Sequence, residues 1–181
     1  MKITTKRLTE LSLMTAIALI IFVIELQIPN LSPIAGIKLG LANVVTVYGV
    51  YKYHWWEISL ILLARIVLGS FFCGNPSAIL YSLSGGVLCL LGILLLKNII
   101  PRNRLWICSV LGAVLHNIGQ IAMAVLLMRT FAVAAYLPFL TVSGCIAGAF
   151  TGMCGQLLLN RLDKKTKSGK PKEGNKSEKQ K

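Results

Sequence analysis

The sequence predicts an all-α integral membrane protein with about six transmembrane helices. Of its 181 residues, 55% are hydrophobic and only 14% are charged, whereas soluble domains are about 25% charged. Apolar runs near 20 residues long recur along the chain, and this is the length that crosses a bilayer. After the first run, residues 33–43 carry a proline, two glycines, a lysine and an asparagine. Backbone groups freed at membrane depth need partners, so this stretch predicts a broken or re-entrant segment.

The expected helices follow from apolar runs that prolines and charges interrupt. Pro29 and Pro33 end the first run, and Pro138 interrupts the last. The second run is short unless residues 38–40 also lie at membrane depth. We expect spans at about residues 11–28, 41–53, 58–72, 77–96, 105–128 and 132–159. We also expect a cytoplasmic segment at residues 1–10, a membrane domain at 11–160 and a basic disordered tail at 161–181.

The net charge of +13 is distributed as a topology signal. Nine of the 19 basic residues lie at or after Arg161, and most of the others flank apolar runs. This pattern favours contact with the lipid bilayer over a nucleic acid partner. Six spans with a cytoplasmic N-terminus place 16 of the 19 basic residues inside. The positive-inside rule therefore predicts a cell (plasma) membrane protein with both termini in the cytoplasm and residues 33–43 facing outward.

Charged side chains within the apolar runs are candidates for a binding site. Arg65 lies inside the third run and Glu25 inside the first, and such residues normally have a partner or a wet cavity. One interpretation is a structural ion pair between Glu25 and Arg65 that holds the two helices together. The other is a pocket in which Arg65 and Lys38 bind an anionic solute, with Asn43 beside them in the break.

The fifth run carries three hydrogen-bonding side chains, His116, Asn117 and Gln120. His116 and Gln120 share one helix face, four residues apart. The cluster either faces a solute or makes hydrogen bonds between helices. A metal site is not expected, because histidines and carboxylates are too few for a ligand set, and no cofactor is expected.

Small residues mark three further stretches. Tyr81 begins a Ser- and Gly-rich stretch through Gly86, where either a ligand or a neighbouring backbone could approach closely. Ser12 and Ala16 form a small-xxx-small pair on the first helix, a candidate docking face. A helix-packing face is expected from glycines that recur at every fourth position, at Gly144, Gly148 and Gly152.

Several of these blocks carry a family resemblance. They are residues 36–43, Arg65 with residues 68–70, residues 81–86, residues 112–120 and residues 136–138. Over about residues 8–160 the chain resembles the bacterial Gx transporter family, which is also labelled heptaprenyl diphosphate synthase component I. That family is similar to the six-helix substrate-binding (S) components of energy-coupling factor importers. The resemblance implies an S-component-like bundle that works with a transmembrane coupling protein and ATPases. Where S components often carry an Ala-xxx-Ala docking pair, this chain has Ser12-xxx-Ala16.

The two family labels imply different chemistry. Prenyl diphosphate synthases bind Mg²⁺–diphosphate through several carboxylates, but the single aspartate of this chain is Asp163, in the tail. No G-x-x-x-x-G-K-[ST] motif for nucleotide binding is present either. We therefore expect a non-catalytic, solute-binding importer subunit for a small anionic solute, such as a vitamin or an isoprenoid or quinone precursor. One alternative is a membrane accessory to heptaprenyl diphosphate synthesis that works with a soluble prenyl synthase subunit. A second is a membrane scaffold without transport activity.

Overall fold

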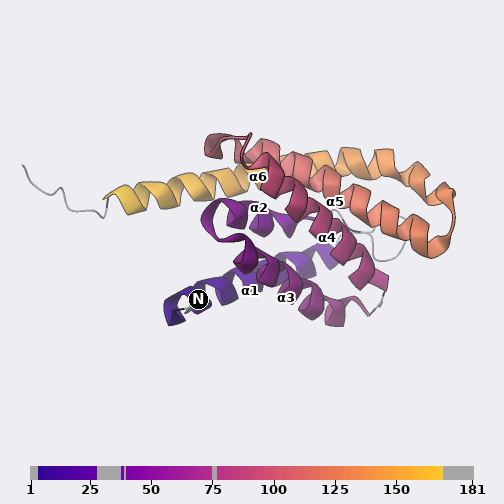
Figure 1. Cartoon of the computed structure of the whole chain (residues 1–181), viewed down its shortest axis with the longest axis horizontal. Coiled ribbons are helices and arrows are strands. Elements are labelled where there is room, and N and C mark those ends of the chain that lie inside the picture. Colours follow the sequence, from indigo (N-terminus) through magenta and orange to yellow (C-terminus); the bar gives the residue numbers. More distant parts are fainter. Residues whose placement is uncertain (1–3, 28–37, 39, 75–76, 169–181) are drawn as a thin grey trace, which may run out of the picture.

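The structure is a computed structural model that describes residues 4–27, 38, 40–74 and 77–168, and every regular element in them is helical. Six α-helices form one bundle, with two 3-10 turns between the later ones (Figure 1). In chain order they are α1 (Thr5–Gln27), α2 (Asn43–Lys52), α3 (Trp55–Cys73), α4 (Ser77–Leu96), η1 (Arg102–Arg104), α5 (Leu105–Met128), η2 (Phe131–Tyr136) and α6 (Leu137–Ser168).

Five segments are long and apolar enough to cross a membrane: α1, α3, α4, α5, and η2 together with most of α6. The exception among the α-helices is α2, whose 10 residues rise only about 15 Å. The hydrocarbon core of a bilayer is about 30 Å thick. The all-α membrane class expected from composition is therefore the class of the structure, with five helices of spanning length.

The six helices alternate in direction. At one end of the bundle Arg7, early in α1, donates two hydrogen bonds of 2.7 Å to Glu57 at the start of α3. The hydroxyl of Tyr51, near the end of α2, donates to the carbonyl of Ile100, just after α4. The first N–H of α5 donates to Gln156, late in α6. Helices α1, α3 and α5 therefore begin at this end, and α2 and α4 finish there.

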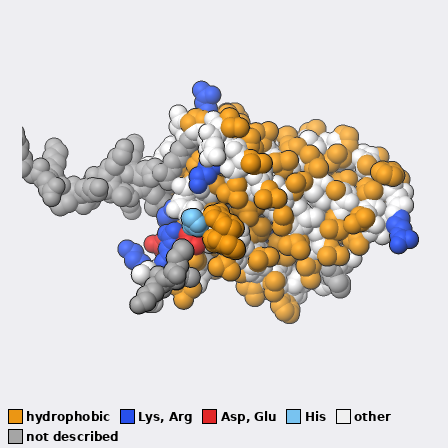
Figure 2. Space-filling view, viewed as in Figure 1, with side chains coloured by type: hydrophobic (Ala, Val, Ile, Leu, Met, Phe, Trp, Pro, Cys, Tyr) orange, Lys and Arg blue, Asp and Glu red, His pale blue; other side chains and the backbone are white. Residues whose placement is uncertain are grey.

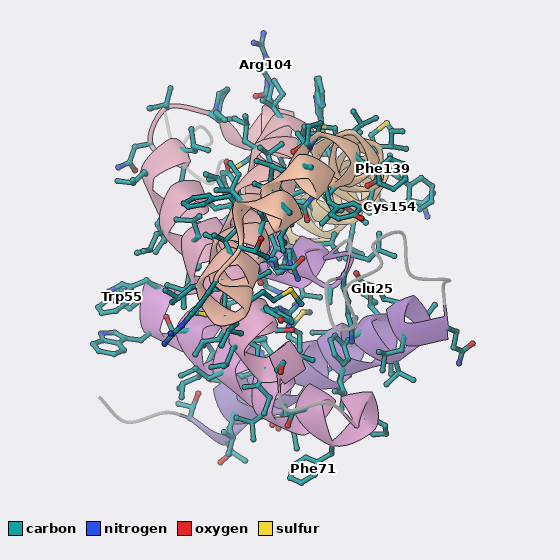
Figure 3. The ribbon with its side chains drawn as sticks, turned by 90° about the vertical axis from the view of Figure 1, so that its right-hand side faces the viewer. Glu25, Trp55, Phe71, Arg104, Phe139 and Cys154 are labelled. Atoms are coloured by element: carbon teal, nitrogen blue, oxygen red, sulfur yellow. The ribbon has the colours of Figure 1, made fainter. Side chains whose placement is uncertain are left out.

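The bundle is apolar on the outside and buries a few charged and polar side chains among its apolar ones. Hydrophobic side chains cover most of the face in Figure 2, and charged side chains lie toward its ends. Figure 3 shows Phe71 and Phe139 projecting outward, whereas Glu25 lies inside the bundle. Phe71 is 80% exposed and Glu25 only 5%. An apolar exterior around buried charges is the arrangement that a lipid environment favours.

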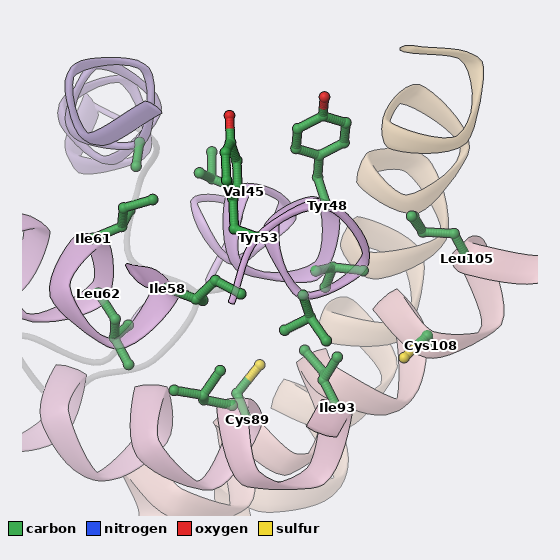
Figure 4. Close-up of a cluster of buried hydrophobic side chains, with 14 of the residues drawn as sticks. Val45, Tyr48, Tyr53, Ile58, Ile61, Leu62, Cys89, Ile93, Leu105 and Cys108 are labelled. Atoms are coloured by element: carbon green, nitrogen blue, oxygen red, sulfur yellow. The ribbon is translucent and has the colours of Figure 1, made fainter. Parts of the chain in front are cut away.

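Helix α2 occupies the middle of the main hydrophobic core. Val47 and Val50 are fully buried there, among Ile58 of α3, Ile93 of α4 and Leu105 of α5 (Figure 4). A helix that is apolar on nearly all sides is stable only when other elements surround it. The second predicted span is thus a short core helix, and it positions the residues just before it inside the bundle.

The glycine series of α6 lies against α5. A Cβ atom at Gly152 would be 2.7 Å from both the Cβ of Ser109 and the Cα of Trp106, and one at Gly148 would be 3.0 Å from the Cβ of Ala113. Gly144 likewise faces the amide of Asn117. The absence of side chains at these positions lets the two helices approach closely.

We expect Gly152→Ala to lower the free energy of unfolding by about 1–3 kcal/mol, because the added methyl group would meet the α5 backbone. Gly155→Ala on the same helix is the matched control, since its Cβ would make ordinary contacts of 3.4 and 3.5 Å. The control should be neutral, or stabilising by up to about 1 kcal/mol through helix propensity. Denaturant titration of the detergent-solubilised variants measures both. Equal losses in the two variants would contradict close α5–α6 packing at Gly152.

Helix boundaries agree with the sequence where turn signals are strong. The spans expected at 77–96 and 105–128 coincide with α4 and α5. The interruption near Pro138 is where η2 ends and α6 begins. One prediction was wrong: residues 161–168 are helical, not part of a disordered tail. Lysine and leucine are good helix formers, so α6 continues past its apolar stretch. Residues 33–37 and 39 of the predicted break lie outside the described residues.

Candidate functional site

A small cavity lies inside the bundle where five segments meet. Its volume is about 10 Å³, which is room for about one water molecule. Its walls come from α1, α3, α4, α5 and the residues just before α2. The lining side chains and backbone belong to Phe22, Glu25, Lys38, Gly40, Arg65, Ser82, His116 and Gln120. Four of the seven predicted solute-binding residues, Lys38, Arg65, His116 and Gln120, therefore share one cavity.

The residues before α2 are held in place through their backbone donors. The N–H of Gly40 donates to the Glu25 carboxylate of α1 at 2.5 Å. The N–H of Lys38 donates to the side-chain oxygen of Gln120 in α5 at 3.3 Å. Backbone groups outside a helix need such partners at membrane depth. Glu25 and Gln120 thus supply acceptors for the polar break that the sequence indicated.

Gly40 is needed here for two independent reasons. Its φ of +79° lies in the left-handed region, which residues with a Cβ atom rarely adopt. A Cβ would also lie 2.7 Å from the Cδ2 of His116 and 2.7 Å from the Nδ2 of Asn43. The backbone at Gly40 therefore packs directly against the His116 imidazole.

Arg65 reaches the same region from α3. Its Nη2 donates to the side-chain oxygen of Asn43 at 3.3 Å, and both side chains are buried. Glu25 lies near enough for Coulomb attraction, but in the described part of the chain no direct ion pair joins it to Arg65. The predicted Glu25–Arg65 pair thus stays a prediction, and in this structure both groups line one cavity.

Two buried nitrogen atoms at the site have no hydrogen-bond partner among the residues that the structure describes. They are Nδ1 of His116 and Nδ2 of Asn43. Unpaired polar groups in an interior are unfavourable, and binding sites are places where they recur. These two atoms therefore offer hydrogen-bonding capacity for a water or a solute.

The charges around the cavity are mainly positive. The ammonium group of Lys38 lies 3.8 Å from the centroid of the Phe22 ring, a cation–π contact at the cavity wall. With Arg65, this places two cations and one carboxylate, Glu25, around the cavity. The site can therefore attract an anionic group.

Two predicted site residues lie elsewhere. The amide of Asn117 donates to the backbone carbonyl of Leu140 at 2.6 Å, a hydrogen bond between α5 and α6. Tyr81 is buried in a separate hydrophobic cluster with Ile121 and Val133. Neither residue lines the cavity. In this structure both side chains make contacts within the bundle, and their role in solute binding stays a prediction.

Sequence reasoning missed three of the lining residues as site residues: Phe22, Gly40 and Ser82. The position of Gly40 within the polar break was a usable signal, because a glycine there permits both a left-handed turn and a close approach. Ser82 lies in the Ser- and Gly-rich stretch for which close approach of a ligand is one interpretation, whereas Phe22 resembles many other residues in apolar helices.

Comparison with known proteins now adds the family. Residues 14–158 match the family model described as heptaprenyl diphosphate synthase component I. The chain belongs to the heptaprenyl diphosphate synthase component I family. The match confirms the resemblance carried by residues 36–43 and 112–120, and it includes every residue that lines the cavity. No curated protein and no solved structure matches the chain.

Proposed function

We propose that this chain is a membrane solute-binding protein, the substrate-binding subunit of an importer for a small anionic solute. The observation that carries the proposal is the convergence of Lys38, Arg65, His116 and Gln120 on one buried cavity. Ionisable groups inside an apolar bundle are unfavourable unless they are paired or functional. Their meeting at one place supports solute recognition as the reason for their presence.

The proposed roles follow from the chemistry of each group. The planar guanidinium of Arg65 can donate two parallel hydrogen bonds to a carboxylate or phosphate. Lys38 adds a second positive charge from the less buried side of the cavity. His116 and Asn43 each hold an unpartnered nitrogen among the described residues, and these atoms would fix the orientation of the solute.

The cavity is too small for a solute in this structure, since a volume of about 10 Å³ holds only about one water molecule. A solute of several non-hydrogen atoms enters only if part of the wall moves. The N–H groups of Lys38 and Gly40 donate to Gln120 and Glu25 at the cavity wall. We therefore propose that Lys38 and Gly40 move away from these acceptors to admit the solute and return over it.

The proposed topology places the cavity toward the outer side. The end of the bundle where α1, α3 and α5 begin carries Arg7, Lys52, Lys97 and Arg104 in or beside the helix ends. The positive-inside rule assigns that end to the cytoplasm of a cell membrane. The alternating directions of the helices support this arrangement, with α2 returning the chain inside the bundle. Coupling to ATP would come from partner proteins.

A retention experiment tests this proposal. The wild-type protein is purified in mild detergent and denatured, and the released small molecules are identified by mass spectrometry. We expect an anionic compound in near-stoichiometric amount, and at least about fivefold less of it in Lys38→Met, as expected for loss of a charge-assisted contact. The control Lys97→Met removes an exposed lysine and should leave the amount unchanged. Equal amounts in all three proteins would contradict the proposed site.

The family match favours a second candidate, a membrane component of heptaprenyl diphosphate synthesis. Because Asp163 is the only aspartate in the chain, the carboxylates that bind Mg²⁺–diphosphate would come from a soluble partner subunit. This candidate requires that the chain co-purifies with such a subunit and increases its yield of heptaprenyl diphosphate. Co-purification without a retained small molecule would favour it over solute import.

A further inference from the structure

A second hollow lies between α1, α2 and α6, and it shares no residue with the polar cavity. Its volume is about 200 Å³ and its lining is almost entirely apolar. Helix α2 forms its floor, and α1 and α6 stand on either side, as Figure 4 shows around Tyr48 and Tyr53. The lining includes Met14, Ile17, Val45, Tyr48, Cys154 and Leu158. We call this hollow the α1–α6 groove.

Next to Tyr48 of its lining, the α1–α6 groove has a polar end. The hydroxyl groups of Tyr48 and Tyr53 are buried, and the Lys52 ammonium group interacts with both oxygens, but their O–H groups have no acceptor among the described residues. The two side chains are only 3% and 5% exposed. In Figure 4 both hydroxyl groups point to the same side of α2, toward the space between α1 and α6. Buried phenol O–H groups normally donate to an acceptor, so two that lack one, side by side, indicate a missing acceptor.

A lysine lies at the same end. The ammonium group of Lys52 is 5.7 Å from the centroid of the Tyr48 ring and 5.3 Å from that of Tyr53. The other nearby cation, Arg7, lies 4.5 Å from the Tyr53 ring and is paired with Glu57. The polar end therefore combines an ammonium group with two phenol donors, a set that complements a phosphate.

The polar end of the groove has the features expected of residues that lie at the level of the lipid headgroups. Trp55 and Trp56 follow within a few residues, stack at 3.9 Å between ring centroids, and are exposed. Exposed tryptophans of membrane proteins concentrate at the boundary between lipid and water. From this level the apolar lining extends along α1 and α6 toward the bilayer interior.

We propose that the α1–α6 groove binds one anionic phospholipid. An acyl chain occupies the apolar lining, and the lipid phosphate accepts hydrogen bonds from Tyr48 and Tyr53 and pairs with Lys52. The apolar lining of the groove and the charge at its end together match an amphiphile of this kind. The proposal involves none of the residues that line the polar cavity, so its test is independent of the test of solute binding.

The test is native mass spectrometry of the full chain after exchange into detergent micelles with equal amounts of phosphatidylglycerol and phosphatidylcholine of the same acyl chains. Wild type should retain one phosphatidylglycerol at least about fivefold over phosphatidylcholine, the preference that one basic residue near a membrane surface provides. Lys52→Gln should abolish this preference. Tyr48→Phe, which keeps the ring packing, should lower the amount of bound phosphatidylglycerol.

The matched control is Lys97→Gln, which removes an exposed lysine that follows α4 at the same end of the bundle. It should retain the wild-type lipid preference. Equal retention of the two lipids by wild type, or an equal loss in Lys97→Gln and Lys52→Gln, would overturn the proposal. Retention of an isoprenoid phosphate in place of a phospholipid would overturn the proposal. So would a dimer in which a second copy of the chain fills the groove.

Discussion

Arg65→Met is expected to remove solute retention and to lower the free energy of unfolding by about 3 kcal/mol. Arg65 is buried, donates to Asn43 and lies in the same cavity as the Glu25 carboxylate. Methionine fills similar volume without charge, so the buried Glu25 loses its nearby cation. Thermal and denaturant unfolding in detergent measure the stability, and mass spectrometry of released compounds measures retention.

Two further variants separate the structural and the functional interpretation of Arg65. Glu25→Gln combined with Arg65→Met removes both buried charges, and neutralising both members of such a set often restores stability. We expect the double variant to recover most of the lost unfolding free energy. Arg104→Met, which removes an arginine that projects outward in Figure 3, should change neither the free energy of unfolding nor the amount of retained solute. A single variant as stable as Arg104→Met would contradict the buried environment of Arg65.

Gly40→Ala is expected to lower the free energy of unfolding by about 2–5 kcal/mol. A left-handed conformation with a Cβ atom costs about 1–2 kcal/mol. The new Cβ would also lie 2.7 Å from both His116 and Asn43, and relieving that overlap costs about 1–3 kcal/mol more. The displaced imidazole should reduce solute retention at the same time. Denaturant unfolding and small-molecule retention are measured on the same preparation.

Gly74→Ala is the matched control for this prediction. Gly74 follows the last residue of α3 with a φ of +62°, and a Cβ there would meet nothing within 4 Å. It therefore has the same conformational penalty without a steric one, and it should lose only about 1–2 kcal/mol. A loss in Gly40→Ala no greater than in Gly74→Ala would show that the segment before α2 does not pack against His116.

The sequence was informative about helices wherever composition and turn signals coincide. In the sequence, the turn-forming residues Gly74 and Pro76 precede α4 and the basic stretch after Leu96 follows it; the same stretch and Arg129 flank α5. The central position of α2 could not be inferred, because a mostly apolar stretch of ten residues is compatible with either a short span or a buried helix. Only packing against α3, α4 and α5 distinguishes the two.

The candidate site was predictable in its charges but not in its geometry. Lys38, Arg65, His116 and Gln120 stand out because polar groups are rare in apolar helices. The same signal picked out Asn117, which bonds to Leu140 instead, since adjacent positions on a helix point about 100° apart. The volume of the cavity depends on where Gly40 packs, and no sequence pattern encodes that contact.

The most direct test of an anionic solute site is small-molecule retention in the Glu25→Gln/Arg65→Met double variant. Its restored stability removes unfolding as an explanation for any loss. We expect the anionic compound released from wild type to be absent from this folded double variant and present in Arg104→Met. Retention of the compound at the wild-type level in the double variant would contradict solute binding at this cavity.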